Sequence, residues 1–147
     1  MLDLSKNDLH GPIPSLSTAH SFISHNKFTG EIPLVICNMS SPIILDLSHN
    51  SLNGVIPECL GNFSNVLRVL DLGMNNFHGN IPVTIAKQNK LKHFPISSLE
   101  VLNLSHNNLS GVIPDCLWNF SNALMVLNLG MNNFHGKIPT IFVEETN

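Results

Sequence analysis

Pairs of leucines separated by one residue recur along the chain, and an asparagine lies three residues after each pair, as in residues 45–50 (LDLSHN). Alternation of this kind predicts a short β-strand whose leucines enter a core while the residue between them faces solvent. We expect three buried pairs, Leu70 and Leu72, Leu102 and Leu104, and Leu127 and Leu129, with Asp71, Asn103 and Asn128 exposed between them.

The asparagine anchors a longer repeat. Its six copies are Asn7, Asn26, Asn50, Asn75, Asn107 and Asn132. Leucine or phenylalanine lies two positions after each anchor, glycine four positions after it, and an Ile-Pro pair at the sixth and seventh positions. Glycine permits backbone conformations that a side chain forbids, and proline has no N–H to extend a strand ladder. The anchor amide is expected to satisfy backbone groups of the turn.

These units predict an α/β-type repeat solenoid. Each unit forms one turn of a short, curved, right-handed coil, with a parallel β-sheet on the concave face and mostly irregular returns. Residues 1–147 then form a single domain of about six coils.

Two intervals between anchors depart from the regular 24 or 25 residues. The first interval is 19 residues long, and irregularity is expected at 15–22, where Ser21 replaces an inward leucine. The fourth is 32 residues long and holds two strand starts, at 91–96 and 99–104. Parallel strands need a longer crossover than this. We therefore predict that 87–98 forms a bulged loop and that the strand after Leu70–Leu72 is Leu102–Leu104.

The unit L-x-x-L-x-L-x-x-N-x-L-x-G-x-I-P resembles the plant-type extracellular leucine-rich repeat. More narrowly, VLRVLDLGMNNFHGNIP and ALMVLNLGMNNFHGKIP resemble the C-terminal repeats of plant receptor-like proteins, which are cell-surface receptors without a kinase. The resemblance implies a location at the extracellular face of the plasma membrane. The family's cysteine-pair caps are missing, as are a secretory signal and an apolar segment long enough to span a bilayer, so we expect a fragment or a truncated product.

The net charge and the positions of the histidines exclude several classes of function. A net charge of −3 and a pI near 6.2 argue against a nucleic-acid footprint. Most histidines occupy recurrent repeat positions, without H-E-x-x-H or Cys-x-x-Cys spacing, so neither a metal site nor a cofactor is expected. No nucleophile, base and orienting group come together, so the chain is not expected to be an enzyme.

Three cysteines cannot all pair within the chain, so a disulfide scaffold is not expected. A bridge between Cys37 and Cys59 would join neighbouring coils. The two cysteines lie at different positions of their units, however, which favours packed or partly exposed thiols.

The outward strand positions form the candidate binding surface, because side chains of neighbouring strands stand about 4.8 Å apart and make a continuous strip. The candidates are Asp46, Ser48, His49, Arg68, Asp71, Met74, Glu100, Asn103, His106, Met125, Asn128 and Met131. Asparagine glycosylation sequons also occur, at Asn38, Asn62, Asn103, Asn108 and Asn119. A glycan on Asn103 would project from the concave face.

The resemblance implies a ligand-recognition module in defence or developmental signalling. Its partners would be a protein, peptide or glycan ligand and a co-receptor kinase. One alternative is a secreted inhibitor similar to polygalacturonase-inhibiting proteins, which intact caps would favour. The other is a truncated product without independent function, because uncapped coils expose core at both ends.

Overall fold

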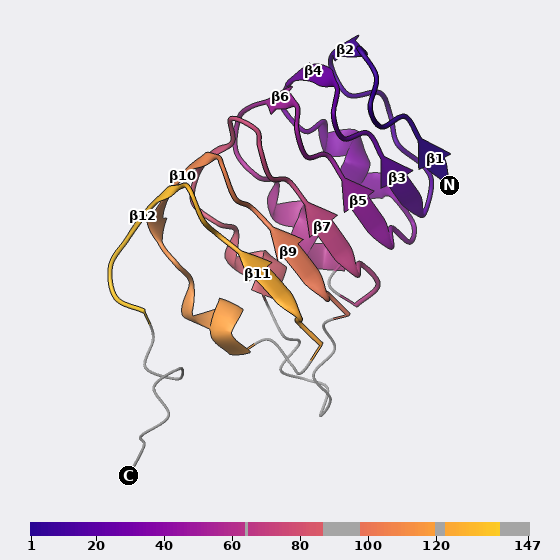
Figure 1. Cartoon of the computed structure of the whole chain (residues 1–147). Helices are drawn as coiled ribbons and strands as arrows, with labels where there is room; N and C mark the ends of the chain where they lie inside the picture. The colour runs from indigo at the N-terminus through magenta and orange to yellow at the C-terminus, as the bar shows by residue number, and fades with distance from the viewer. Residues whose placement is uncertain (64, 87–97, 120–122, 139–147) are drawn as a thin grey trace.

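Six parallel strands stand side by side in chain order and form the main sheet (Figure 1). The computed structural model describes residues 1–63, 65–86, 98–119 and 123–138. The strands are β1 (Leu2–Asp3), β3 (His20–Phe22), β5 (Ile44–Asp46), β7 (Val69–Asp71), β9 (Val101–Asn103) and β11 (Val126–Asn128). The expected leucine-rich repeat solenoid is confirmed, with one strand of this sheet contributed by each coil.

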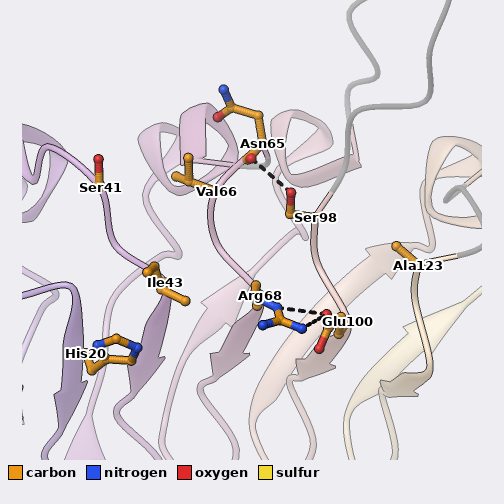
Figure 2. A pocket seen from close by; sticks show the side chains of 9 residues that line it. All are labelled: His20, Ser41, Ile43, Asn65, Val66, Arg68, Ser98, Glu100 and Ala123. Carbon is orange, nitrogen blue, oxygen red and sulfur yellow. Dashed lines mark hydrogen bonds and ion pairs between the residues drawn. The ribbon is translucent and has the colours of Figure 1, made fainter.

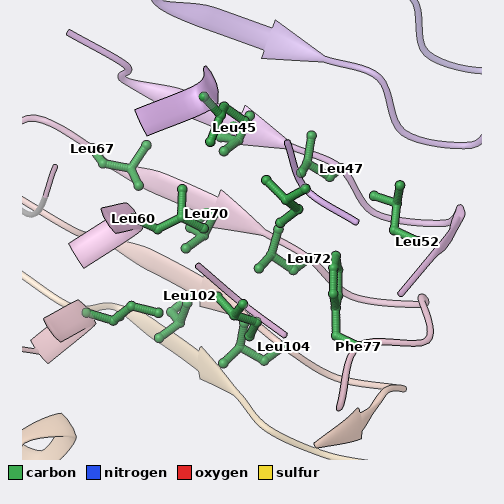
Figure 3. Close-up of a cluster of buried hydrophobic side chains, with 14 of the residues drawn as sticks. Leu45, Leu47, Leu52, Leu60, Leu67, Leu70, Leu72, Phe77, Leu102 and Leu104 are labelled. Atoms are coloured by element: carbon green, nitrogen blue, oxygen red, sulfur yellow. The ribbon is translucent and has the colours of Figure 1, made fainter. Parts of the chain in front are cut away.

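The core lies directly behind this sheet, and its leucines align from coil to coil (Figure 3). Leu45, Leu70, Leu102 and Leu127 pair in register across four neighbouring strands. Leu70, Leu72, Leu102 and Leu104 are at most 1% exposed, as predicted. The prediction was wrong for Leu127 and Leu129, which are only half-buried. They belong to the coil of β11, which has a neighbouring strand on one side only within the described chain.

The returns hold more regular structure than the sequence pattern indicated. A second set of short parallel strands runs through the segments around the repeat glycine. One group contains β2 (His10–Gly11), β4 (Lys27–Gly30) and β6 (Ser51–Leu52), and the other contains β8 (His78–Gly79), β10 (Asn108–Val112) and β12 (Asn133–His135). A bridge between Val55 and His78 links the two groups. Short 3-10 helices follow the Ile-Pro pairs: η1 (Leu34–Asn38), η2 (Glu58–Phe63), η3 (Val83–Ala86) and η4 (Asp115–Asn119).

The anchor asparagines connect each coil to the one before it. In Asn75, Oδ1 accepts a hydrogen bond from the Leu52 N–H at 3.0 Å, and Nδ2 donates to the Leu47 carbonyl at 3.0 Å. Nδ2 also donates to Leu72 of its own coil at 3.2 Å. The same bonds to the preceding coil recur at Asn26, Asn50, Asn107 and Asn132. The expectation that the amide satisfies turn groups is confirmed, and it reaches the neighbouring turn as well.

The repeat glycine serves both conformation and packing. Gly54 has a φ of +79°, a left-handed conformation in which side chains are strained. A Cβ on Gly54 would also lie 2.6 Å from the Glu31 side chain of the preceding coil. The glycine therefore leaves room for its neighbour as well as allowing the turn.

The two irregular intervals still place their strands in register. Ser21 is fully buried in β3, and its hydroxyl lies 3.0 Å from the Thr18 hydroxyl, which supplies a partner in the core. In the fourth interval, β9 pairs directly with β7, so the predicted succession of Leu70–Leu72 by Leu102–Leu104 is confirmed. The expected loop lies outside the described residues except for Ser98, whose hydroxyl donates to the Asn65 carbonyl at 2.9 Å.

A disulfide joins Cys37 of η1 to Cys59 of η2, with the two Cα atoms 5.6 Å apart. The expectation of separate thiols at these positions was therefore wrong. An offset of two residues amounts to only about 4 Å along a 3-10 helix, which neighbouring coils accommodate. The third cysteine, Cys116, donates from Sγ to the Val83 carbonyl at 3.7 Å. No helix in the described parts of the chain is both long and apolar enough to cross a membrane.

Candidate recognition surface

The concave face, meaning the outward side chains of the main sheet and of its strand ends, carries three columns of candidate residues. The central column follows the sheet register, with Asp46 beside Asp71, Asp71 beside Asn103, and Asn103 beside Asn128. A second column precedes the strands and contains Arg68, Glu100 and Met125, and a third follows them and contains His49, Met74, His106 and Met131.

The central column is more enclosed than the sequence pattern predicted. Asp71 and Asn103 are half-buried rather than exposed, and in the central column only Asn128 is exposed. The difference arises because Asp71 and Asn103 have strands on both sides, whereas Asn128 lies on the last strand of the described sheet. Burial raises the pKa of the Asp71 carboxyl, and the neighbouring Asp46 carboxylate adds to that effect. Hydrogen bonds from the Gly73 N–H and from Asn103, together with the proximity of His49, partly offset it.

A serine two positions after the central residue supplies a hydroxyl in most coils. Ser48 donates from Oγ to Asp46 at 2.7 Å, and Ser105 donates in the same way to Asn103 at 2.8 Å. Ser48 is also buried and does not offer its side chain to a ligand, contrary to its place among the predicted site residues. In the coil of β7 this position is Gly73, and the amide of Asn103 occupies the space that a side chain would fill.

A shallow groove of about 640 Å³ runs past the beginnings of the main strands (Figure 2). Arg68 and Glu100 lie next to each other in its lining, with Arg68 Nε donating to Glu100 Oε1 at 2.8 Å and Nη2 bonded to the same oxygen. Further lining residues that the sequence pattern did not single out are His20, Ser41, Ile43, Asn65, Val66, Ser98 and Ala123. Most of them lie one to three positions before a strand, so the repeat spacing is a signal that finds them.

The third column has an unusual backbone. Its members directly precede the anchor asparagine. They and the two residues at the same repeat position of earlier coils, Lys6 and His25, all have φ values of 53–58°. Left-handed conformation is uncommon for residues other than glycine. It turns these exposed side chains toward solvent at the strand ends, where the His25 and His49 rings stack with centroids 4.0 Å apart. Sequence reasoning identified the positions but not this conformation.

The described side chains contain no group of three or more His, Cys, Asp or Glu residues that could hold a metal ion. What the concave face offers is a neutral ion pair, paired carboxylates, amides, imidazoles and thioethers on neighbouring coils. Such a surface suits recognition of an extended or folded partner through many polar and apolar contacts.

Comparison with known proteins places the repeats among plant sequences. The family described as Leucine Rich Repeat matches residues 42–63, 66–88 and 98–120. Receptor-like protein 35 of Arabidopsis thaliana is 42% identical over 106 residues, which are 72% of this chain and 10% of that protein. The chain thus spans about a tenth of the length of that relative.

Solved structures show the same architecture. One is the Arabidopsis receptor kinase HAESA in complex with the peptide hormone IDA and the co-receptor SERK1. It aligns with a TM-score of 0.78 and 35% identity over 95% of this chain and 22% of that chain. Another is the BIR3–SERK2 complex from Arabidopsis thaliana, with a TM-score of 0.72 and 31% identity over 92% of this chain and 69% of that chain.

Proposed function

Because the chain belongs to the leucine-rich repeat family and matches the repeats of plant receptor-like proteins, we propose that it is a ligand-recognition region of such a receptor. The receptor would act in defence or developmental signalling from the extracellular face of the plasma membrane. The observation that carries the proposal is the concave face, on which chemically varied side chains stand at equivalent positions of successive coils.

The dimensions of the sheet are compatible with an extended peptide as the ligand. Neighbouring coils are about 4.8 Å apart, whereas an extended peptide rises about 3.3 Å per residue. A peptide lying across all six strands would therefore present roughly seven residues to the concave face. The HAESA complex, which contains a peptide hormone, supports this ligand class.

The Cys37–Cys59 bridge supports the proposed location, because structural disulfides persist in oxidising compartments and are rare in the cytosol. A co-receptor kinase is the proposed second partner, since the HAESA complex also contains the co-receptor SERK1.

Panning a random peptide library against the immobilised chain tests the peptide proposal. His106→Glu, on the concave face, should weaken binding of the selected peptides by tenfold or more, by analogy with a hot-spot loss of about 1.4 kcal/mol. His78→Glu is the matched control, because His78 is also exposed but lies in β8, on the second set of strands. Equal losses in both variants, with unchanged thermal stability, would contradict recognition by the concave face.

Surface plasmon resonance with the SERK1 ectodomain tests the second partner. Binding that increases when a selected peptide is present would support a co-receptor role. Unchanged response with and without the peptide would argue against it.

A further inference from the structure

Two glycosylation sequons occupy the same place on neighbouring coils. Asn38 and Asn62 each lie twelve residues after an anchor, Asn26 and Asn50 respectively. Asn38 is the last residue of η1 and Asn62 lies within η2, so both belong to the 3-10 returns behind the main sheet (Figure 1). Both residues are exposed. An amide nitrogen in this setting has open solvent in which to carry a large sugar.

A third sequon, at Asn103, has a different environment. Its Nδ2 donates to Asp71 Oδ1 at 2.9 Å, and its Oδ1 accepts from the Ser105 N–H at 3.1 Å. The hydroxyl of Ser105, which is the third residue of the sequon, is also bonded to Asn103, at 2.8 Å. Nδ2 would stand 2.6 Å from a Cβ on Gly73, so it packs directly over that backbone. A sugar on this nitrogen would have to displace the packing between two strands.

From this contrast we propose that Asn38 and Asn62 carry N-linked glycans in the folded, secreted protein and that Asn103 does not. The proposal rests on the proposed function only in requiring passage through the secretory pathway. The resulting sugars form a column along the 3-10 returns. They shield that side from partners and leave the concave face open.

The chemistry is a group transfer from a lipid-linked oligosaccharide pyrophosphate. A bond forms between the asparagine Nδ2 and C1 of the first sugar as the bond from C1 to the pyrophosphate oxygen breaks. The amide loses one proton to a base, the lipid pyrophosphate leaves, and nothing is oxidised or reduced. This transfer acts on the entering chain, whereas the fold decides which glycosylated chains can complete folding.

Glycopeptide mass spectrometry of the full chain, secreted from eukaryotic cells behind a cleavable leader, tests the proposal. The chain carries Asn108→Gln and Asn119→Gln, which leave three sequons. We expect high occupancy at Asn38 and Asn62 and at least tenfold lower occupancy at Asn103. Asn38→Gln and Asn62→Gln should each remove one glycan from the intact mass.

Two outcomes would overturn the proposal: Asn103 occupied as fully as Asn62 in secreted protein, or Asn38 and Asn62 both bare. Occupancy is compared among Asn38, Asn62 and Asn103 in one chain that keeps all three asparagines. The result therefore does not depend on whether an Asn103 variant folds. Occupancy is also independent of peptide binding, so failure of this proposal and failure of the receptor proposal are separate results.

Discussion

The amide nitrogen of Asn103 donates a hydrogen bond to the carboxylate of Asp71 on the neighbouring strand, at 2.9 Å. The bond forms where Gly73 replaces the serine that serves the equivalent position of other coils. The Gly73 N–H also donates to Asp71, at 3.0 Å, so the side chain from the next coil supplies the side-chain donor that the coil of β7 lacks. The arrangement makes Asp71 part of the packing between strands as well as part of the concave face.

Replacing Asp71 with Asn should change how stability depends on pH. Because burial raises the pKa of Asp71 above its ordinary value of 3.8, the folded state binds a proton more tightly than the unfolded state does. The free energy of unfolding should therefore fall as pH rises from about 3.8 to the raised pKa, and this loss persists at higher pH. Asp71→Asn should remove that decrease and be at least as stable as the unmodified chain at neutral pH.

Urea unfolding across this pH range measures the difference between the two proteins. Asp3, whose pKa is lowered mainly by its hydrogen bond from the Ser5 side chain, contributes the opposite slope but is present in both. Identical pH profiles would show that Asp71 does not titrate differently on folding.

Truncation of a core leucine should cost more in the middle of the sheet than at its last strand. Leu104→Ala should lower the free energy of unfolding by about 2–5 kcal/mol, because Leu104 is completely buried. Leu129→Ala, at the equivalent position of the last described coil, should cost clearly less because Leu129 is half-buried. Equilibrium denaturation gives both values, and a larger loss for Leu129→Ala would contradict the described burial.

Removing an anchor amide should destabilise the chain more than truncating a polar side chain usually does. Asn75→Ala leaves the Leu52 N–H without its bond to this side chain, and an unsatisfied buried group costs about 1–3 kcal/mol. The Leu47 carbonyl loses the bond from Asn75 but keeps the one from Asn50 Nδ2 at 3.2 Å. The adjacent Asn76 is exposed, so Asn76→Ala is the control and should change stability by less than about 0.5 kcal/mol. Thermal and urea unfolding of the two variants measure these losses. A loss for Asn76→Ala as large as that for Asn75→Ala would contradict the role of the anchor amide.

Reduction of the Cys37–Cys59 bridge should destabilise the chain. The cysteines are 22 residues apart, and opening a loop of this size costs about 3 kcal/mol through the greater freedom of the unfolded chain. Cys37→Ser should match the effect of dithiothreitol, whereas Cys116→Ser should have a smaller effect. A melting temperature that does not respond to dithiothreitol would count against the bridge.

Features that belong to a single coil could be predicted from the sequence. The alternation of Leu102 and Leu104 and the invariant offset of Asn75 from its glycine are set within one unit, so periodicity identifies them. The succession of β7 by β9 also followed, because chain length alone forbids an additional strand between them.

Features that depend on the lateral fit between coils were missed or wrong. The Cys37–Cys59 bridge, the burial of Ser48 and the Arg68–Glu100 groove each depend on how residues of different coils align sideways. The left-handed conformation before each anchor could not be predicted from residue type either, because lysine, histidine and methionine all adopt it.

That conformation has a consequence for how the surface varies between related proteins. The turn is held by the backbone and by the following asparagine, while the side chain of the left-handed residue projects outward and takes little part in the core. Residue identity there is therefore free to drift, within the limit that branched side chains such as valine and isoleucine are disfavoured. Under the proposed function, point mutations at this column would alter specificity one coil at a time while the scaffold stays intact.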